Sequence, residues 1–336
     1  MGIDLPVVWT VIIAFGLMMY VIMDGFDLGL GILFPFVPGR HDRDVMVNTV
    51  APVWDGNETW LVLGGAGLMA AFPLAYAVVL SALYIPLALM LLGLIWRGVA
   101  FEFRFKADEN HKPFWDRAFM VGSMVATFFQ GASLGAFMNG IPAEGARFLG
   151  GPMDWLTPFS VFTGLGLLVA YALLGATWLI IKTEGALHDR MVALARPVLL
   201  TLLGVIAVVS LWTPLSHPEV AARWFSLPNL LFFAPVPLLV VLTAGLLLRA
   251  LRGGNPGVTP FMLALVLLFL GYSGLGISMW PNIIPPGITI REAAAPPQSL
   301  GFALVGALLI IPVILAYTAW SYYVFRGKVR AGEGYH

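Results

Sequence analysis

Residues 155–181 read WLTPFSVFTGLGLLVAYALLGATWLII, an apolar run that contains no Asp, Glu, Lys or Arg. A helix needs roughly 20 apolar residues to cross the hydrocarbon core of a bilayer, so this run predicts a membrane-spanning helix. Six further runs are equally free of charged side chains, and the last of them is the shortest: 74–96, 118–137, 227–248, 258–280, 299–325 and 197–212. The chain therefore reads as an integral membrane protein.

The composition excludes several other classes of protein. The 336 residues are 60% hydrophobic and only 11% charged, whereas a soluble domain carries roughly a quarter of charged residues. We therefore expect an all-α integral membrane fold. The chain has no Cys, which excludes a disulfide framework and thiolate ligands for a metal or haem. Its formal net charge is zero, which argues against a nucleic-acid partner.

The first 72 residues are long enough for two more helices, which brings the expected number of crossings to about nine. Because no soluble domain interrupts the series, we expect a single polytopic membrane domain over residues 1–336. The expected helices cover residues 6–37, 52–72, 74–97, 117–138, 155–181, 196–213, 227–249, 258–280 and 299–326.

The distribution of Lys and Arg predicts the orientation, since cytoplasmic loops are enriched in these residues. With nine crossings, one side holds only Arg147, Arg223 and Arg291. The other side holds Arg40, Arg43, Arg97, Arg104, Lys106, Lys112, Arg117, Lys182, Arg190, Arg196, Arg249, Arg252, Arg326, Lys328 and Arg330. We therefore expect the N-terminus outside and the C-terminus in the cytoplasm.

The first helix carries two acidic residues, Asp24 and Asp27, in the string DGFDLGLG. A spacing of three places both carboxylates on one face of the helix, in its cytoplasmic half. A lone carboxylate in lipid costs at least a few kcal/mol, so both should face protein or water. Gly25, Gly29 and Gly31 should allow a neighbouring backbone to approach closely.

The second helix has a clean apolar stretch only over 60–72, which reaches about 20 Å and falls short of a crossing. The preceding string WDGNETW must therefore enter the membrane, with Asp55 and Glu58 at the cytoplasmic end. Together with the pair on the first helix, this gives four acidic residues on the same side. Such residues inside a membrane usually have a function.

Structural alternatives exist for each acidic pair. Asp55 and Glu58 fit a helix N-cap with a reciprocal Glu at N3, and Asp24 and Asp27 could merely hydrogen-bond to neighbouring helices. For the function of the whole chain, two possibilities are an ion-coupled secondary transporter and a purely structural scaffold subunit. Transporters tend to show broken helices at matching positions in two halves, and the later helices show no counterpart of these acidic strings, which disfavours transport.

The longest polar connection is expected over residues 101–117, FEFRFKADENHKPFWDR. Its alternation of Phe with charged residues suggests a segment in the membrane interface, where Arg104 and Lys106 reach for lipid headgroups.

All histidines fall in expected loops or in the tail: His41, His111, His188, His217 and His336. Without a His or Cys inside the membrane, few axial ligands remain for a haem. We therefore expect that this chain binds no haem by itself.

Four strings of the sequence resemble those of subunit II of the cytochrome bd-type quinol oxidases, including the cyanide-insensitive branch. They are DGFDLGLG (24–31), NTVAPVWDGNETWL (48–61), PNIIPPGITIREAAAPPQSLGF (281–302) and AYTAWSYYVFRGKV (316–329). They follow the family's order and span essentially the whole chain. One departure is Gly287, where the family pattern has Ser.

The resemblance implies a heterodimer in the bacterial plasma (inner) membrane. In it, a partner, subunit I, binds two haems b and one haem d, oxidises quinol near the outer face and reduces dioxygen to water with cytoplasmic protons. Subunit II would share its fold of two four-helix bundles plus a peripheral helix. Whether a quinone binds in this chain, and whether small single-helix subunits join the complex, stays open.

The resemblance also implies roles for individual residues. Asp55 matches the acidic residue at the entry of a proton pathway toward the haems, and Trp54 stands beside it. Asp24 and Asp27 match the paired carboxylates that would continue the pathway. Glu58 joins them with less specificity, since a Gln would serve its capping role.

Overall fold

A computed structural model of the chain describes residues 3–253 and 256–329, and the described part is almost entirely helical. Arg330 and His336, named above among the basic residues and the histidines, lie outside these residues. The helices are α1 (Leu5–Leu33), the 3-10 turn η1 (Phe34–Phe36), α2 (Arg40–Asn48), α3 (Trp54–Ala71), α4 (Pro73–Lys106), α5 (Lys112–Met138), α6 (Pro158–Lys182), α7 (Gly185–Ser216), α8 (Pro218–Phe225), α9 (Asn229–Phe233), α10 (Pro235–Arg252), α11 (Thr259–Met279), α12 (Ile290–Ala293) and α13 (Pro297–Val324). Two short hairpins accompany them, β1 (Ala143–Glu144) with β2 (Arg147–Phe148) and β3 (Asn282–Ile284) with β4 (Ile288–Thr289).

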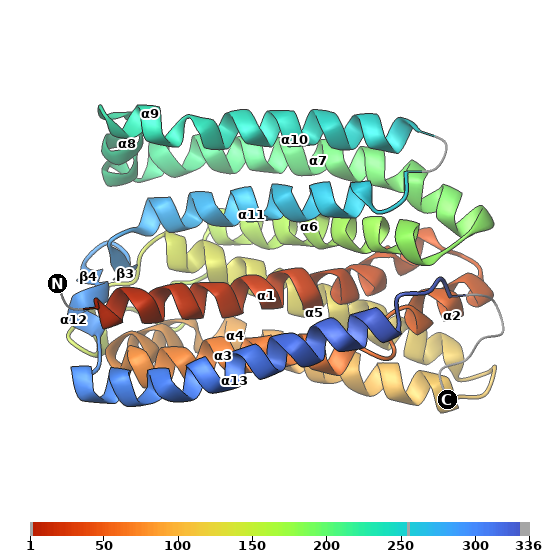
Figure 1. Cartoon of the computed structure of the whole chain (residues 1–336), viewed down its shortest axis with the longest axis horizontal. Helices are drawn as coiled ribbons and strands as arrows, with labels where there is room; N and C mark the ends of the chain where they lie inside the picture. The colour runs from red at the N-terminus through yellow and green to blue at the C-terminus, as the bar shows by residue number, and fades with distance from the viewer. Residues whose placement is uncertain (1–2, 254–255, 330–336) are drawn as a thin grey trace.

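The long helices lie roughly side by side along the long axis of the molecule (Figure 1). α7 and α10 form one edge, α6 and α11 follow, α1 and α5 lie in the middle, and α3, α4 and α13 form the other edge. Both hairpins and the start of α1 lie at one end, which we name the hairpin end. α2 and the last turns of α4 and α10 lie at the opposite end, which we name the basic end.

By length and hydropathy, eight helices of the described residues could cross a membrane. α3 is outside this set because its first turns are polar, although its 18 residues span about 27 Å. It begins after α2 at the basic end and finishes at the hairpin end, where the amide of Ala295 donates to the carbonyl of Ala71. The expected nine crossings therefore stay a prediction that depends on α3.

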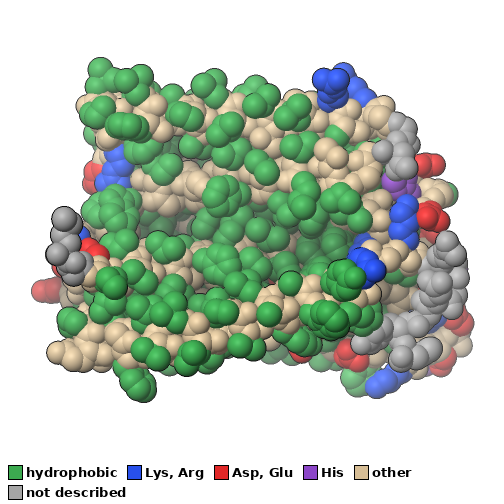
Figure 2. All heavy atoms as spheres, viewed as in Figure 1, with side chains coloured by type: hydrophobic (Ala, Val, Ile, Leu, Met, Phe, Trp, Pro, Cys, Tyr) green, Lys and Arg blue, Asp and Glu red, His purple; other side chains and the backbone are tan. Residues whose placement is uncertain are grey.

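The outer surface agrees with a multi-pass membrane protein. Figure 2 shows hydrophobic side chains over the middle of the visible face and charged side chains at its two ends. Isolated hydrophobic residues are normal on soluble proteins, but a band of this extent calls for a lipid or protein neighbour. α13 is the clearest case, because Leu300 is the only residue buried along it.

Several helix boundaries differ from the sequence-based expectation. α4 was expected to end at 97 and continues to Lys106, so most of the expected interfacial segment 101–117 is helix. Arg104 is 1% exposed, with its Nε 2.6 Å from Asp116 and its Nη2 2.7 Å from Asp44. The prediction that Arg104 reaches lipid headgroups is therefore wrong, because two carboxylates from α5 and α2 hold it inside the protein.

The start of α7 and several small elements also went unpredicted. α7 begins at Gly185 rather than at 196, and its first turns are polar. α2, α8 and the two hairpins were expected to be loops. Each of these elements is too short or too polar to produce the long apolar signal on which the prediction of crossings rests.

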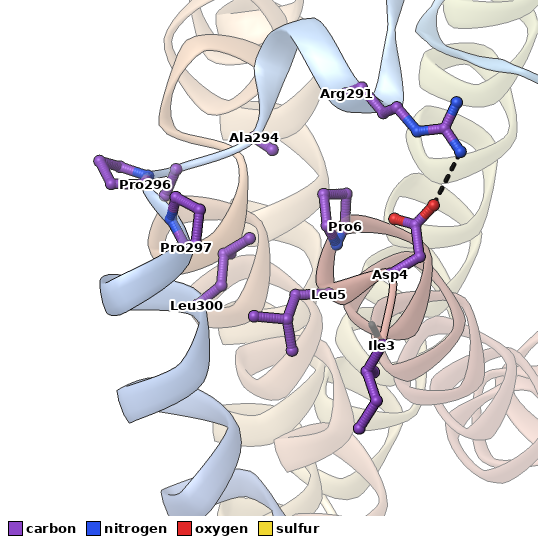
Figure 3. A pocket seen from close by; sticks show the side chains of 10 residues that line it. Ile3, Asp4, Leu5, Pro6, Arg291, Ala294, Pro296, Pro297 and Leu300 are labelled. Atoms are coloured by element: carbon purple, nitrogen blue, oxygen red, sulfur yellow. Dashed lines mark hydrogen bonds and ion pairs between the residues drawn. The ribbon is translucent and has the colours of Figure 1, made fainter. Parts of the chain in front are cut away.

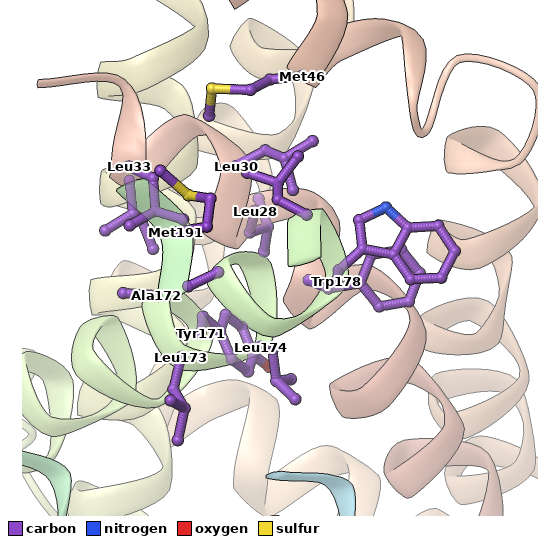
Figure 4. Packing of buried hydrophobic residues seen from close by; sticks show 14 of the residues in the cluster. Leu28, Leu30, Leu33, Met46, Tyr171, Ala172, Leu173, Leu174, Trp178 and Met191 are labelled. Carbon is purple, nitrogen blue, oxygen red and sulfur yellow. The ribbon is translucent and has the colours of Figure 1, made fainter. Parts of the chain in front are cut away.

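The centre of the fold is a close contact between α1 and α6. A Cβ on Gly29 would meet the carbonyl of Tyr171 and the backbone of Gly175, so only glycine allows this approach. The expectation of close backbone contact along the string DGFDLGLG is therefore confirmed. Around it, Leu28 and Leu30 of α1 and Leu173 of α6 belong to one hydrophobic cluster, and none of the three has exposed surface (Figure 4). This packing fixes the face of α1 that carries the acidic pair.

Candidate functional site

Asp24 and Asp27 lie on α1 with no exposed surface. Both face protein, as expected for carboxyl groups at membrane depth. An Oδ1 of Asp24 lies 2.5 Å from Nη2 of Arg97 on α4. Arg97 is itself 1% exposed, so the ion pair is fully enclosed. A buried charge requires such a partner, since its desolvation otherwise costs several kcal/mol.

The same guanidinium connects Asp24 to Glu58 on α3. Nη2 of Arg97 lies 3.2 Å from Oε2 of Glu58, whose side chain is 29% exposed. The ring of Trp54 lies against the guanidinium at 5.4 Å, a distance at which an aromatic face attracts a cation. Arg97 therefore joins a carboxylate inside the protein to one that reaches its surface.

Asp27 is held by a second chain of hydrogen bonds. Nδ2 of Asn57 donates to Oδ2 of Asp27 at 2.8 Å, and the hydroxyl of Tyr322 donates to Oδ1 of Asn57 at 2.8 Å. Asn57 is 1% exposed. Because Tyr322 belongs to α13, this chain ties the last long helix to the acidic face of the first.

Asp55 lies in the first turn of α3, exposed at the basic end. The interpretation of Asp55 as an N-cap is wrong, because Val53 occupies that position and no side-chain capping bond is present. Asp55 lies three residues before Glu58, which places both on one face of α3. It is the exposed member of the acidic group at this end.

We name the seven residues Trp54, Asp55, Glu58, Asp24, Asp27, Asn57 and Arg97 the acidic cluster. It holds four carboxyl groups and one guanidinium. Oδ2 of Asp24 and Oδ1 of Asp27 are buried and have no hydrogen-bond partner among the described residues. Free lone pairs on enclosed carboxyl groups are positions at which protons can be taken up and released.

The sequence predicted five members of this cluster and missed two. Arg97 was counted among the basic residues at the cytoplasmic end of an expected helix, and Asn57 was not predicted as a site residue. A signal for Arg97 was present, since Arg97 and Arg104 are seven residues apart and lie on the same face of a helix that continues beyond 97. Asn57 gives no comparable signal, because only its partners reveal its role.

The histidines of the described residues do not fit a haem site inside the helices. His41 and His111 are exposed near the basic end, and His188 and His217 lie at the two ends of α7. No group of three or more His, Asp or Glu side chains within the described ranges could hold a metal ion.

A cavity of about 670 Å³ lies at the hairpin end, far along α1 from the acidic cluster. Figure 3 shows its apolar walls, formed by residues such as Leu5, Pro297 and Leu300, and an ion pair at its rim. There Nη2 of Arg291 donates to Oδ2 of Asp4 at 2.7 Å. This cavity contains none of the acidic residues predicted from the sequence.

Known proteins are similar to this chain over almost its whole length. The family described as cytochrome bd terminal oxidase subunit II matches residues 5–325. The chain is 29% identical to cytochrome bd-I ubiquinol oxidase subunit 2 of Escherichia coli (strain K12), over 96% of this chain and 94% of the relative. It is also 29% identical to cytochrome bd ubiquinol oxidase subunit 2 of Bacillus subtilis (strain 168), over 97% of each.

A solved structure shows the same fold. The bd oxidase from Geobacillus thermodenitrificans contains a chain that superposes with a TM-score of 0.77, at 19% sequence identity, over 96% of this chain and 99% of that one. The family match extends over both acidic strings and over α13, so it covers every element that builds the acidic cluster. The chain belongs to the cytochrome bd terminal oxidase subunit II family.

Proposed function

We propose that this chain supports a haem-bearing subunit I in oxidising quinol and reducing dioxygen to water, and that its acidic cluster delivers protons to that reaction. As subunit II of a bd oxidase it is part of an oxidoreductase complex with a subunit I partner. The relatives are named ubiquinol oxidases, which supports quinol as the reductant.

The observation that carries the proton-delivery proposal is the connection from the surface to the buried pair. Asp55 is exposed, Glu58 is partly exposed, and Arg97 links Glu58 to the fully buried Asp24, one turn from Asp27. A carboxyl group can accept a proton from solvent and pass it to a neighbour, and the carboxyl groups of Glu58 and Asp24 both contact the same nitrogen of Arg97. Arg97 stays positively charged during proton transfer. It therefore stabilises the carboxylates electrostatically, and the carboxyl groups exchange the protons.

We further propose that two haems b and one haem d reside in subunit I and that this chain is not catalytic alone. The position of the described histidines, in loops or near helix ends, supports this division. A haem would supply electron transfer and oxygen chemistry in the partner, while this chain holds and moves protons. A bound quinone and small single-helix subunits are compatible with the same assembly.

We also propose that the complex lies in the bacterial inner membrane with the basic end in the cytoplasm. Most Lys and Arg of the described chain lie at that end, and only Arg147, Arg223 and Arg291 lie at the other. This is the asymmetry that the positive-inside tendency produces. Protons taken up at Asp55 would then come from the cytoplasm.

A purely structural role for the cluster is the second candidate, and one observation favours it. The Arg97–Asp24 pair is tight and fully enclosed, as in a contact that only fastens α1 to α4. The two candidates differ in what a neutral substitution at the exposed entry does. Among the described residues, Arg97 forms ion pairs with Asp24 and Glu58 and not with Asp55, so the loss of the Asp55 charge leaves the buried pair intact.

Two experiments test the proposal. Reduced-minus-oxidised visible spectra should show b- and d-type haem bands in the complex purified from native membranes and none in the chain expressed alone. Asp55→Asn should slow oxygen consumption at unchanged haem content, whereas Glu102→Gln, an exposed carboxylate on α4 at the same end, should not. Haem bands in the chain expressed alone would contradict the assignment of the haems to subunit I. Full activity of Asp55→Asn would contradict proton delivery by the acidic cluster.

A further inference from the structure

The side-chain amide of Asn57 occupies a position in which its orientation matters. One side of the amide faces Oδ2 of Asp27 and the other faces the hydroxyl of Tyr322, each at 2.8 Å. An amide presents a donor on one side and an acceptor on the other. In the observed arrangement Nδ2 donates to Asp27, and Oδ1 accepts from Tyr322, which is the arrangement that an ionised Asp27 requires.

A proton on Asp27 changes which arrangement is satisfied. If the proton were on Oδ1, it would be a buried donor without an acceptor, because Oδ1 has no partner among the described residues. Such a group costs the full desolvation of a polar atom. On Oδ2 the proton faces Asn57 instead, and it is satisfied if the amide turns over and presents its own Oδ1.

We propose that Asn57 is a two-position amide that turns over when Asp27 takes up a proton and transmits the change to Tyr322. In the protonated state the carboxylic O–H of Asp27 donates to Oδ1 of Asn57, and Nδ2 donates to the oxygen of Tyr322. One proton is added to Oδ2 of Asp27, and no other covalent bond changes. Asn57 thus acts as a positioning residue, since the proton itself does not cross the amide.

A small cavity next to Tyr322 offers space for its O–H once that O–H no longer points at Asn57. Tyr322 lines a cavity of about 10 Å³ together with Thr49, Trp178, Lys182 and Phe325, at the lower limit of the space that one water needs. The hydroxyl of Thr49 accepts from Nε1 of Trp178 at 3.2 Å and keeps a second lone pair. When Asn57 becomes a donor, the phenolic O–H must turn away from it, and this cavity beside Tyr322 is the space into which it would turn.

The helix that carries Tyr322 is anchored next to this cavity. Nζ of Lys182 donates to the carbonyls of Phe325 and Gly327 and lies 5.0 Å from the ring of Trp178. The Tyr322 ring also meets Trp178 and Phe26 edge-on, with centroids 6.1 and 6.5 Å apart. The ring is thus fixed while its hydroxyl is free to rotate, which is what a transmitted change of hydrogen-bond direction requires.

The groups that face Asp27 come from four elements. Asp24 lies on α1 itself, Glu58 on α3, Arg97 on α4 and Tyr322 on α13, and from α6 Tyr171 faces the neighbouring Asp24. Of these, only Tyr322 reaches Asp27 through a neutral hydrogen-bonded residue. A change in the hydrogen bonding of the Tyr322 hydroxyl therefore distinguishes a turning amide from the general electrostatic effect of a changed charge on Asp27.

Infrared difference spectra of the complete complex, recorded between two pH values, test the coupling. A protonated-carboxyl band that disappears in Asp27→Asn identifies Asp27, and a phenol band that disappears in Tyr322→Phe identifies Tyr322. We expect both bands in the wild-type spectrum, and we expect Asp27→Asn to abolish the Tyr322 band as well. Tyr317→Phe is the matched control, because Tyr317 lies on the same helix and is 67% exposed.

Two results would overturn the inference. One is a wild-type spectrum without an Asp27 band, and the other is a Tyr322 band that persists unchanged in Asp27→Asn. Tyr322→Phe retains the packed ring, so it should assemble normally and shift the Asp27 band, whereas Tyr317→Phe should leave it in place.

The effect on turnover rests on the proposed proton delivery, whereas the infrared coupling does not. We expect oxygen consumption to fall about twofold to tenfold in Tyr322→Phe, the size of effect that accompanies loss of one hydrogen bond between neutral groups. If the Asp27 and Tyr322 bands are coupled but Tyr322→Phe has wild-type turnover, the turning amide is supported and the result counts against proton delivery. If the two bands are not coupled but Tyr322→Phe turns over slowly, proton delivery is supported and the turning amide is contradicted.

Discussion

The guanidinium of Arg97 lies 2.5 Å from the carboxylate of Asp24, and neither side chain has more than 1% of its surface exposed. α4 and α1 are thus joined by two charges that neither water nor lipid can solvate. Arg97 also reaches Glu58 at 3.2 Å, so a single cation serves two carboxylates from two helices. Removing it leaves more uncompensated charge than removing either partner.

Arg97→Gln should therefore destabilise the complex strongly. Loss of one partner of a buried pair costs about 3–5 kcal/mol of unfolding free energy, because the remaining charge stays buried. We expect a lower thermal midpoint and loss of assembled complex, measured in detergent. Arg117→Gln, at an exposed arginine of α5, is the control, and equal midpoints of the two variants would refute the structural importance of the pair.

Asp27→Asn should reduce oxygen consumption at least about tenfold, since a positioned proton-transfer group contributes roughly 10²–10⁴-fold. The amide has the size of the carboxyl group, so the packing of α1 is kept and the haem spectrum should stay normal. Turnover per haem measures the effect. A variant with full turnover would show that Asp27 carries no protons that limit the reaction.

Gly29→Ala tests the contact that aligns the acidic face of α1 with its neighbours. The added Cβ would collide with the carbonyl of Tyr171 and the backbone of Gly175, and overpacking of this kind costs on the order of 1–3 kcal/mol. Gly245→Ala on α10 meets nothing within 4 Å and should be neutral or slightly stabilising. Thermal midpoints of the two variants should therefore differ, and equal values would argue against the close approach.

The ion pair at the rim of the hairpin-end cavity gives a pH-dependent prediction. The hydrogen bond from Arg291 lowers the pKa of Asp4 below its ordinary value. The stabilisation is therefore present above the ordinary pKa of an aspartate and is lost as the pH falls through the lowered one. Arg291→Gln should raise the pKa of Asp4, as followed by pH titration of its carboxyl signal in nuclear magnetic resonance spectra. An unchanged titration would show that the pair does not form.

The sequence predicted the membrane helices well because long apolar runs are a local property. It failed where a charge is buried by a partner far away in the chain. Arg97 was interpreted as the polar end of a helix and Arg104 as part of an interfacial connection, yet each is enclosed by carboxylates from other helices. The helix continues past both of them because Asp24 and Asp116 neutralise them, which no local pattern reveals.

The acidic cluster was predicted only in part for the same reason. Acidic residues at membrane depth are conspicuous in a sequence, so Asp24 and Asp27 were found. Asn57 and Tyr322 carry no charge, and they become important only because Asn57 donates to Asp27 and accepts from Tyr322. The capping interpretation of Asp55 failed because the helix begins at Trp54, two residues earlier than a cap at Asp55 would require.

Time-resolved proton uptake is the most direct test of the central claim that the acidic cluster delivers protons. The fully reduced complex is mixed with dioxygen in the presence of a pH-indicating dye, and uptake is followed together with haem oxidation. The account predicts that Asp27→Asn and Asp55→Asn slow proton uptake about tenfold or more, while the first electron transfer to dioxygen and the Glu102→Gln control keep wild-type rates. Wild-type uptake in both variants would contradict it and leave the cluster a structural role.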